Sequence, residues 1–204
     1  MRLIALAALC ILAITPAFAA DKTLTAPKTG APAPVFSASD TKGVTQSLAA
    51  YKGKTVVLEW TNAECPYVKK HYGSGNMQNL QKMATDAGTV WLRINSGAPG
   101  KQGHLSAQES DALAAKQNVA ATATILDEKG DIGRMYGAKT TPAIAIINRD
   151  GVLVYQGAID DRPTSDPADI PNAKNYVKTV LDDLAAGRPA SVTTTQSYGC
   201  GVKY

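Results

Sequence analysis

The order of strand-like and helix-like segments after residue 55 constrains the fold of this 204-residue chain more than any other feature. Five apolar segments rich in β-branched residues have the composition of buried strands: residues 55–60, 89–95, 122–126, 143–148 and 152–158. Five other segments favour helix: residues 66–72, 76–87, 106–118, 129–136 and 172–186. Residues 76–87 and 172–186 place apolar side chains on one face, and Ser106 to Glu109 has the spacing of a capping box. The last two strands flank the hairpin turn Arg149-Asp-Gly151. This order predicts an α/β fold with a mixed central sheet and helices on both faces.

Residues 1–19 have the pattern of a bacterial export signal. Arg2 supplies a positive charge, residues 3–14 form an apolar core too short to span a bilayer, and Ala17-Phe18-Ala19 is an A-x-A cleavage site. We therefore expect a periplasmic or secreted protein with no membrane segment after cleavage, in a compartment that permits disulfides. A retained N-terminal anchor is the alternative. Cleavage would leave two cysteines, Cys65 and Cys200.

The mature chain is expected to hold one domain. Residues 20–34 are rich in Thr, Lys, Pro and Ala and predict a flexible lead-in. Residues 35–187 contain the predicted strands and helices, with a short hairpin at the start, and residues 188–204 form a Ser/Thr/Gly-rich tail. The net charge is only +4 and no dense basic run occurs, so nucleic acid is not an expected partner.

Cys65 has the sequence context of a reactive thiol. It follows the strand at 55–60 and precedes Pro66, which is tolerated at the first position of a helix. Unpaired backbone N–H groups and the helix dipole at such a position favour the thiolate, which is the nucleophile. Lys69 lies one helical turn later and could also stabilise the thiolate, although an ordinary solvated lysine fits equally well.

The tail offers Cys65 its candidate partner. At about 3.3–3.6 Å per extended residue, the tail is long enough for Cys200 to reach Cys65. Cys200 would then resolve an oxidised Cys65 or a mixed disulfide. The alternatives are a static Cys65–Cys200 disulfide that fastens the tail to the domain, and pairing of Cys200 with another molecule.

Thr141-Pro142 directly precedes the predicted strand at 143–148. An X-Pro bond at this place could be trans and end a loop, or cis, as about 5–6% of X-Pro bonds are. The dipeptide alone does not decide between them.

Together these features resemble a known family. Trp60 and Cys65-Pro66 at a strand–helix junction, with Thr141-Pro142 before the next-to-last strand, resemble the thioredoxin fold. Three segments narrow the resemblance to the peroxiredoxin-like branch of the alkyl hydroperoxide reductase/thiol-specific antioxidant (redoxin) proteins, over residues 33–204: Cys65-Pro-Tyr-Val-Lys-Lys-His71-Tyr, Gly157-Ala-Ile-Asp160 and Tyr198-Gly-Cys200-Gly.

The resemblance implies a thioredoxin-like three-layer fold with an N-terminal hairpin extension, and an oxidoreductase with Cys65 in the place of the first active-site cysteine. Thr141 and a cis Pro142 would hold a substrate's backbone or sulfur beside it. A thiol-containing protein or a peroxide is the implied substrate, and a second protein the reductant. No organic cofactor is implied. No metal site is expected either, because no close cysteine pair would anchor one.

The sequence departs from both better-known relatives. Val68 stands where thioredoxins have their second cysteine, and Asn62 and Leu58 stand where peroxiredoxins have a threonine and a proline. Thiol–disulfide exchange and peroxide reduction therefore both stay open. The alternative is a non-enzymatic binding module, in which Cys65 and Cys200 form a permanent crosslink and Thr141-Pro142 shapes a peptide groove.

Overall fold

The computed structural model describes residues 26–204, so the export signal predicted at residues 1–19 and the first part of the lead-in lie outside the described residues. The described chain is built around a five-stranded sheet in the order β5-β4-β3-β7-β8. Its strands are β3 (Val56–Trp60), β4 (Val90–Asn95), β5 (Ala123–Leu126), β7 (Ala143–Ile147) and β8 (Leu153–Gly157). The first three run parallel, whereas β7 pairs antiparallel with β3 and β8. The predicted mixed sheet is therefore confirmed.

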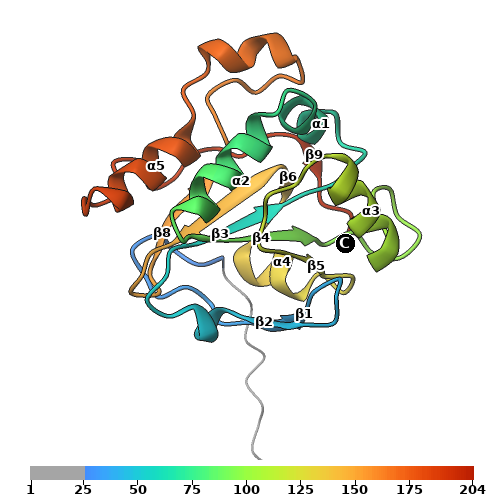
Figure 1. The fold of residues 1–204 in the computed structure, drawn as a ribbon, viewed down its shortest axis with the longest axis horizontal. Coiled ribbons are helices and arrows are strands. Elements are labelled where there is room, and N and C mark those ends of the chain that lie inside the picture. Colours follow the sequence, from blue (N-terminus) through green and yellow to red (C-terminus); the bar gives the residue numbers. More distant parts are fainter. Residues whose placement is uncertain (1–25) are drawn as a thin grey trace, which may run out of the picture.

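Helices cover both faces of this sheet (Figure 1). One face carries α1 (Pro66–Gly73), α2 (Asn76–Asp86) and α5 (Tyr176–Ala185). The other carries α4 (Asp131–Tyr136) and the hairpin of β1 (Ser37–Ser39) and β2 (Thr45–Ser47). The remaining helices are α3 (Ala107–Lys116) and the 3-10 helices Leu48–Tyr51 and Pro167–Asn172. The thioredoxin-like three-layer fold with an N-terminal hairpin is confirmed. No helix within residues 26–204 is long and apolar enough to cross a membrane.

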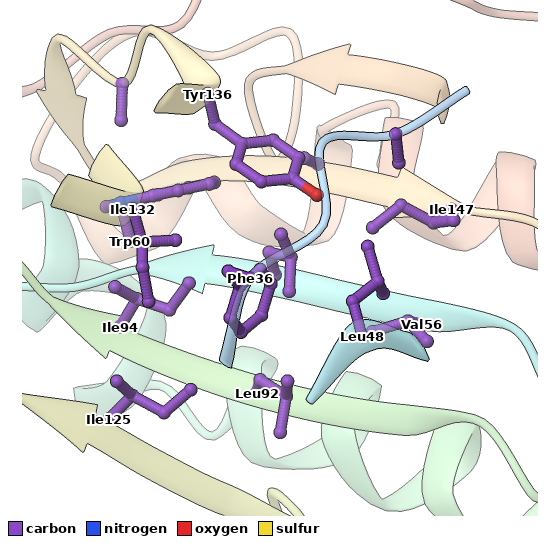
Figure 2. Close-up of a cluster of buried hydrophobic side chains, with 14 of the residues drawn as sticks. Phe36, Leu48, Val56, Trp60, Leu92, Ile94, Ile125, Ile132, Tyr136 and Ile147 are labelled. Atoms are coloured by element: carbon purple, nitrogen blue, oxygen red, sulfur yellow. The ribbon is translucent and has the colours of Figure 1, made fainter. Parts of the chain in front are cut away.

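Alternate residues of β3 face opposite layers and divide the core in two. Val56 and Trp60 point toward the hairpin and α4, where the Tyr136 ring lies 6.3 Å from that of Phe36 and 5.6 Å from that of Trp60 (Figure 2). Val57 points into the layer of α1, α2 and α5. Successive side chains of a strand face opposite sides, so an unbroken apolar run indicates a strand buried on both. All of β3 is buried accordingly.

The described part of the lead-in lies against β8. The Gly30 N–H donates to the Leu153 carbonyl at 2.8 Å, and the Leu153 N–H donates to the Ala31 carbonyl at 3.0 Å. Composition favoured a flexible lead-in, but β8 is the edge strand of the sheet, and its open backbone groups bind this segment.

The tail also pairs with the domain. Residues Cys200–Gly201 form β9, antiparallel to β6 (Thr140–Thr141). Upstream, Thr194 forms a parallel bridge with Gln156, and downstream the Val202 N–H donates to the Lys139 carbonyl at 3.0 Å. A Ser/Thr/Gly-rich segment carries no strand periodicity, which is why the sequence did not predict these pairings.

A buried carboxylate, Glu59, links β3 to the helices above it. Its oxygens accept hydrogen bonds from the Tyr72 hydroxyl at 2.6 Å, the Gln81 amide at 3.0 Å and the Trp91 indole at 2.7 Å. Arg93 is its register partner on β4 and is also buried. A buried carboxylate is tolerated only when it is hydrogen-bonded and compensated in this way.

Glu59→Ala is expected to lower the free energy of unfolding by about 3 kcal/mol, because it leaves the buried Tyr72 hydroxyl and Trp91 indole without an acceptor and removes one of the two acceptors of the Gln81 amide. Asp86→Ala is the control: it removes an exposed carboxylate paired with Lys82 and should cost about 0.5 kcal/mol or less. Urea unfolding of the two variants measures both values. Similar losses for the two would contradict the role assigned to Glu59.

Candidate functional site

Cys65 lies at the start of α1, in the N-cap position before Pro66. It is 0% exposed, and its thiol donates a hydrogen bond to the Thr141 carbonyl at 3.1 Å. The Thr141-Pro142 peptide bond is cis, as the resemblance implied. The Thr141-Pro142 loop therefore contacts the Cys65 sulfur at the junction between β3 and α1.

Cys200 is brought to the same place by the pairing of β9 with β6. In that ladder Thr141 is the register partner of Cys200. The two cysteines carry free thiols, and their side chains interact with each other. The backbone of Thr141, expected to hold a substrate, thus pairs with the chain's own tail.

The surroundings shift the two thiols in opposite directions. Burial raises the pKa of Cys65, but hydrogen bonds from the Cys200 thiol and from the backbone N–H groups of Val68 and Tyr67 outweigh it, so the pKa lies below its ordinary value. For Cys200, burial and then the neighbouring Cys65 sulfur raise the pKa to about 11. Of the two thiols, Cys65 therefore loses its proton more readily, and the Cys200 thiol then donates a hydrogen bond to it.

Lys69 lies on the exposed side of α1. The groups that lower the pKa of Cys65 are the Cys200 side chain and the backbone N–H groups at the start of the helix. The helix N-terminus thus contributes as expected, while an activating role for Lys69 stays a prediction.

Gly199 allows the tail to approach Thr141 closely. Its φ is +127°, a backbone conformation that residues with a side chain rarely adopt. A Cβ atom at this position would lie 2.0 Å from the Thr141 carbonyl oxygen. The glycine before Cys200 is therefore required for β9 to reach β6.

Tyr198 anchors the tail in a buried charged cluster that sequence reasoning missed. Lys70 and Asp160 are 0% and 2% exposed, with 3.7 Å between Nζ and the nearer carboxylate oxygen. The Tyr198 hydroxyl donates to Asp160, and its ring packs against that of Tyr67 at 5.8 Å. The Lys70 ammonium also donates to the Arg162 carbonyl at 2.8 Å. The buried ion pair thus holds the tail two residues before Cys200.

His71 completes this cluster as a neutral side chain. Burial lowers its pKa to about 4, with Lys70 acting in the same direction and Asp160 against it. The Asn76 amide donates to Nδ1 at 2.8 Å, which leaves the proton on Nε2, 3.3 Å from the Tyr198 hydroxyl. Helical spacing from Cys65 directs Lys70 and His71 away from the sulfur. The sequence signal for the cluster is the family resemblance, whose three segments contain Lys70, His71, Asp160 and Tyr198.

The structure brings Cys65, Cys200, Thr141 and Pro142 together. Within the described residues, no group of three His, Cys, Asp or Glu side chains is arranged to hold a metal ion. The site's chemistry is that of two adjacent thiols, one favouring the charged form and the other the neutral form.

Comparison with protein-family models matches residues 28–177 to Redoxin. The chain belongs to the Redoxin family. Membership of this family supports a thiol redox role and agrees with the thioredoxin-like fold. A search of curated proteins found no match.

Solved structures agree on the fold of this redoxin. An uncharacterized conserved protein from Geobacillus kaustophilus is 25% identical, with a TM-score of 0.73 over 88% of this chain and 93% of that one. A hypothetical protein from Sinorhizobium meliloti is 23% identical, with a TM-score of 0.70 over 88% and 96%. A putative protein disulfide isomerase from Bacteroides thetaiotaomicron is 19% identical, with a TM-score of 0.56 over 78% and 91%. At such identities, the last two establish fold similarity alone.

Proposed function

We propose that this redoxin is an exported thiol–disulfide oxidoreductase whose redox pair is Cys65 and Cys200. The observation that carries the proposal is the pairing of Cys200 with Thr141, which sets the Cys200 thiol against the Cys65 sulfur at the start of α1. Export rests on the signal-like sequence at residues 1–19. The partners would be a thiol-containing protein and a second redox protein.

The arrangement suits a reversible two-electron step. When the two thiols give up two electrons and two protons, the Cys65 and Cys200 sulfurs join in a disulfide and a partner disulfide becomes a dithiol. The reverse step oxidises a partner dithiol. The lowered pKa of Cys65 gives this sulfur a larger thiolate fraction than an ordinary cysteine has at the same pH.

The contacts of the tail favour redox cycling over a permanent crosslink. Tyr198 is held by Asp160, Val202 by the Lys139 carbonyl, and the Tyr204 hydroxyl donates to the Ala138 carbonyl at 2.6 Å. These contacts hold the tail in place without a disulfide. The tail therefore does not need a Cys65–Cys200 crosslink to stay bound to the domain.

The groups near Cys65 favour disulfide exchange over peroxide reduction. The Asn62 side chain is already engaged, since its oxygen accepts from the Glu64 N–H at 2.9 Å and its amide donates to the Gln102 carbonyl at 3.2 Å. Leu58 is an apolar residue within the core. Neither position carries the hydroxyl that a threonine would offer to a peroxide.

Redox titration of the exported protein tests the proposal. Mature protein is equilibrated in glutathione buffers of graded potential, its free thiols are alkylated, and the Cys65 and Cys200 peptides are quantified by mass spectrometry. We expect both thiols to disappear together into one disulfide, at a potential above about −300 mV. A potential well below that value would indicate a structural crosslink, and independent oxidation of the two thiols would exclude the pair.

A further inference from the structure

The two sulfurs of the pair differ in their access to solvent. Cys65 is 0% exposed, lying between α1 and the Thr141-Pro142 loop and next to Cys200. Cys200 is only half-buried. Its neighbours Gly199 and Gly201 have no side chains, and a Cβ atom added at Gly201 would find only the Lys139 carbonyl oxygen, at 4.0 Å. A large partner molecule can therefore approach Cys200 while the docked tail excludes it from Cys65.

We propose that partner thiols exchange with Cys200 and never bond to Cys65. Cys65 is the thiolate that leaves when the Cys65–Cys200 disulfide is opened, and it re-forms that disulfide with Cys200 in the next cycle. This proposal rests on the proposed Cys65–Cys200 redox pair and adds the direction of attack to it. It also implies a substrate class, namely proteins with an accessible dithiol, which the oxidised form of this chain would oxidise.

A partner thiolate attacks Sγ of Cys200, a new sulfur–sulfur bond forms there, and the bond to Cys65 breaks with its electron pair leaving on Cys65. The partner's second thiolate then attacks the partner's own bonded sulfur and expels Cys200, which takes up a proton. The partner dithiol has lost two electrons and two protons, Cys65 is a thiolate, Cys200 is a thiol, and one proton is released to solvent.

The groups around Cys65 suit a leaving thiolate. A departing Cys65 sulfur receives hydrogen bonds from the backbone N–H groups of Val68, Cys200 and Tyr67. Attack at Cys65 would instead expel Cys200, a half-buried sulfur whose pKa is raised chiefly by burial. A leaving thiol of lower pKa departs faster, so leaving-group ability and access both direct the attack to Cys200. Stabilisation of the reduced form also makes the disulfide a stronger oxidant.

The docked tail restricts how a partner can bind. β9 already uses the strand-pairing positions of Thr140 and Thr141. A partner segment therefore cannot add as a strand at β6 while Cys200 is in place. Recognition of the partner would depend on its thiols and on surface around Gly201, which is exposed.

Mapping of the first mixed disulfide tests the proposal. Oxidised mature protein is mixed with one equivalent of reduced glutathione, quenched in acid at short times and alkylated under denaturing conditions, and the two cysteine peptides are quantified by mass spectrometry. The control is the same reaction in guanidinium chloride, where both sulfurs are accessible. We expect the ratio of Cys200 adduct to Cys65 adduct to exceed the control ratio by at least about tenfold.

The two proposals fail in distinguishable ways. A ratio no higher than in guanidinium chloride, or an excess of adduct on Cys65, would overturn the direction of attack and leave the redox pair standing. A starting protein that does not form the Cys65–Cys200 disulfide on oxidation would overturn the proposed function itself.

Discussion

Cys65→Ser protein is expected to lose dithiol oxidation completely, because the two-electron step needs a second sulfur to bond with Cys200. Cys200→Ser is expected to lose it as well, since Cys65 then has no partner within the chain. The measurement is the oxidation of a reduced, unfolded test protein in a glutathione buffer, compared with the wild-type protein. Thermal unfolding of both variants confirms that the fold is kept.

The two serine variants should differ in the pKa of the thiol that remains. In the wild-type protein burial and then the Cys65 sulfur raise the pKa of Cys200 to about 11, so Cys65→Ser should lower it toward the ordinary value of 9.0. Cys200→Ser removes a hydrogen bond that lowers the pKa of Cys65, so that pKa should rise. Ultraviolet absorbance of the thiolate against pH measures both. Residual dithiol oxidation by Cys65→Ser protein, or an unchanged pKa of Cys200 in it, would contradict a coupled pair.

The parts of the fold that the sequence predicted are those with a periodic physical cause. The unbroken apolar run that became β3 indicated burial on both faces, and the structure buries all of that strand. Ser106 and Glu109 have the spacing of a capping box, and both of its hydrogen bonds are present at the start of α3. Cys65 before Pro66 likewise predicted, from neighbouring residues alone, a sulfur at a helix N-terminus, and the structure places Cys65 there.

The parts that the sequence did not predict depend on contacts between distant segments. Helical spacing indicates only that Lys70 points away from Cys65, and the return of the chain at Asp160 makes it half of a buried ion pair. Tyr198 reads as part of an irregular tail, yet it completes that pair from the far end of the chain. Such side chains carry no periodic signal, because their partners are set by the tertiary fold rather than by neighbouring residues.

Gly199→Ala is expected to release the tail from the site in the reduced protein. The added Cβ atom would lie 2.0 Å from the Thr141 carbonyl oxygen, and because both atoms are fixed by the backbone no rotamer change relieves the contact. A φ of +127° adds strain for any residue with a side chain, typically about 1–3 kcal/mol. Since about 1.4 kcal/mol is a factor of ten in an equilibrium constant, this strain together with the steric contact should lower the equilibrium constant for docking of the tail by about 10²-fold.

One rate and one equilibrium constant should move in opposite directions as the tail leaves. Alkylation of Cys65 by iodoacetamide should become about 10²-fold faster, because β9 no longer covers the sulfur. Formation of the Cys65–Cys200 disulfide from oxidised glutathione should become less favourable by a similar factor, because the effective concentration of Cys200 at Cys65 falls. Both are measured on reduced mature protein, by peptide mass spectrometry and by redox equilibration.

Gly201→Ala is the matched control for this change. Gly201 is the other neighbour of Cys200, and a Cβ atom there would meet nothing closer than the Lys139 carbonyl oxygen at 4.0 Å. The same methyl group is thus added on either side of the same cysteine, once against β6 and once into open space. If both variants alkylate at the wild-type rate, tail docking through Gly199 does not shield Cys65. If both are equally fast, the tail is held too weakly for the Thr141–Cys200 pairing to control access. Only acceleration confined to Gly199→Ala fits a sulfur protected by the pairing of β9 with β6.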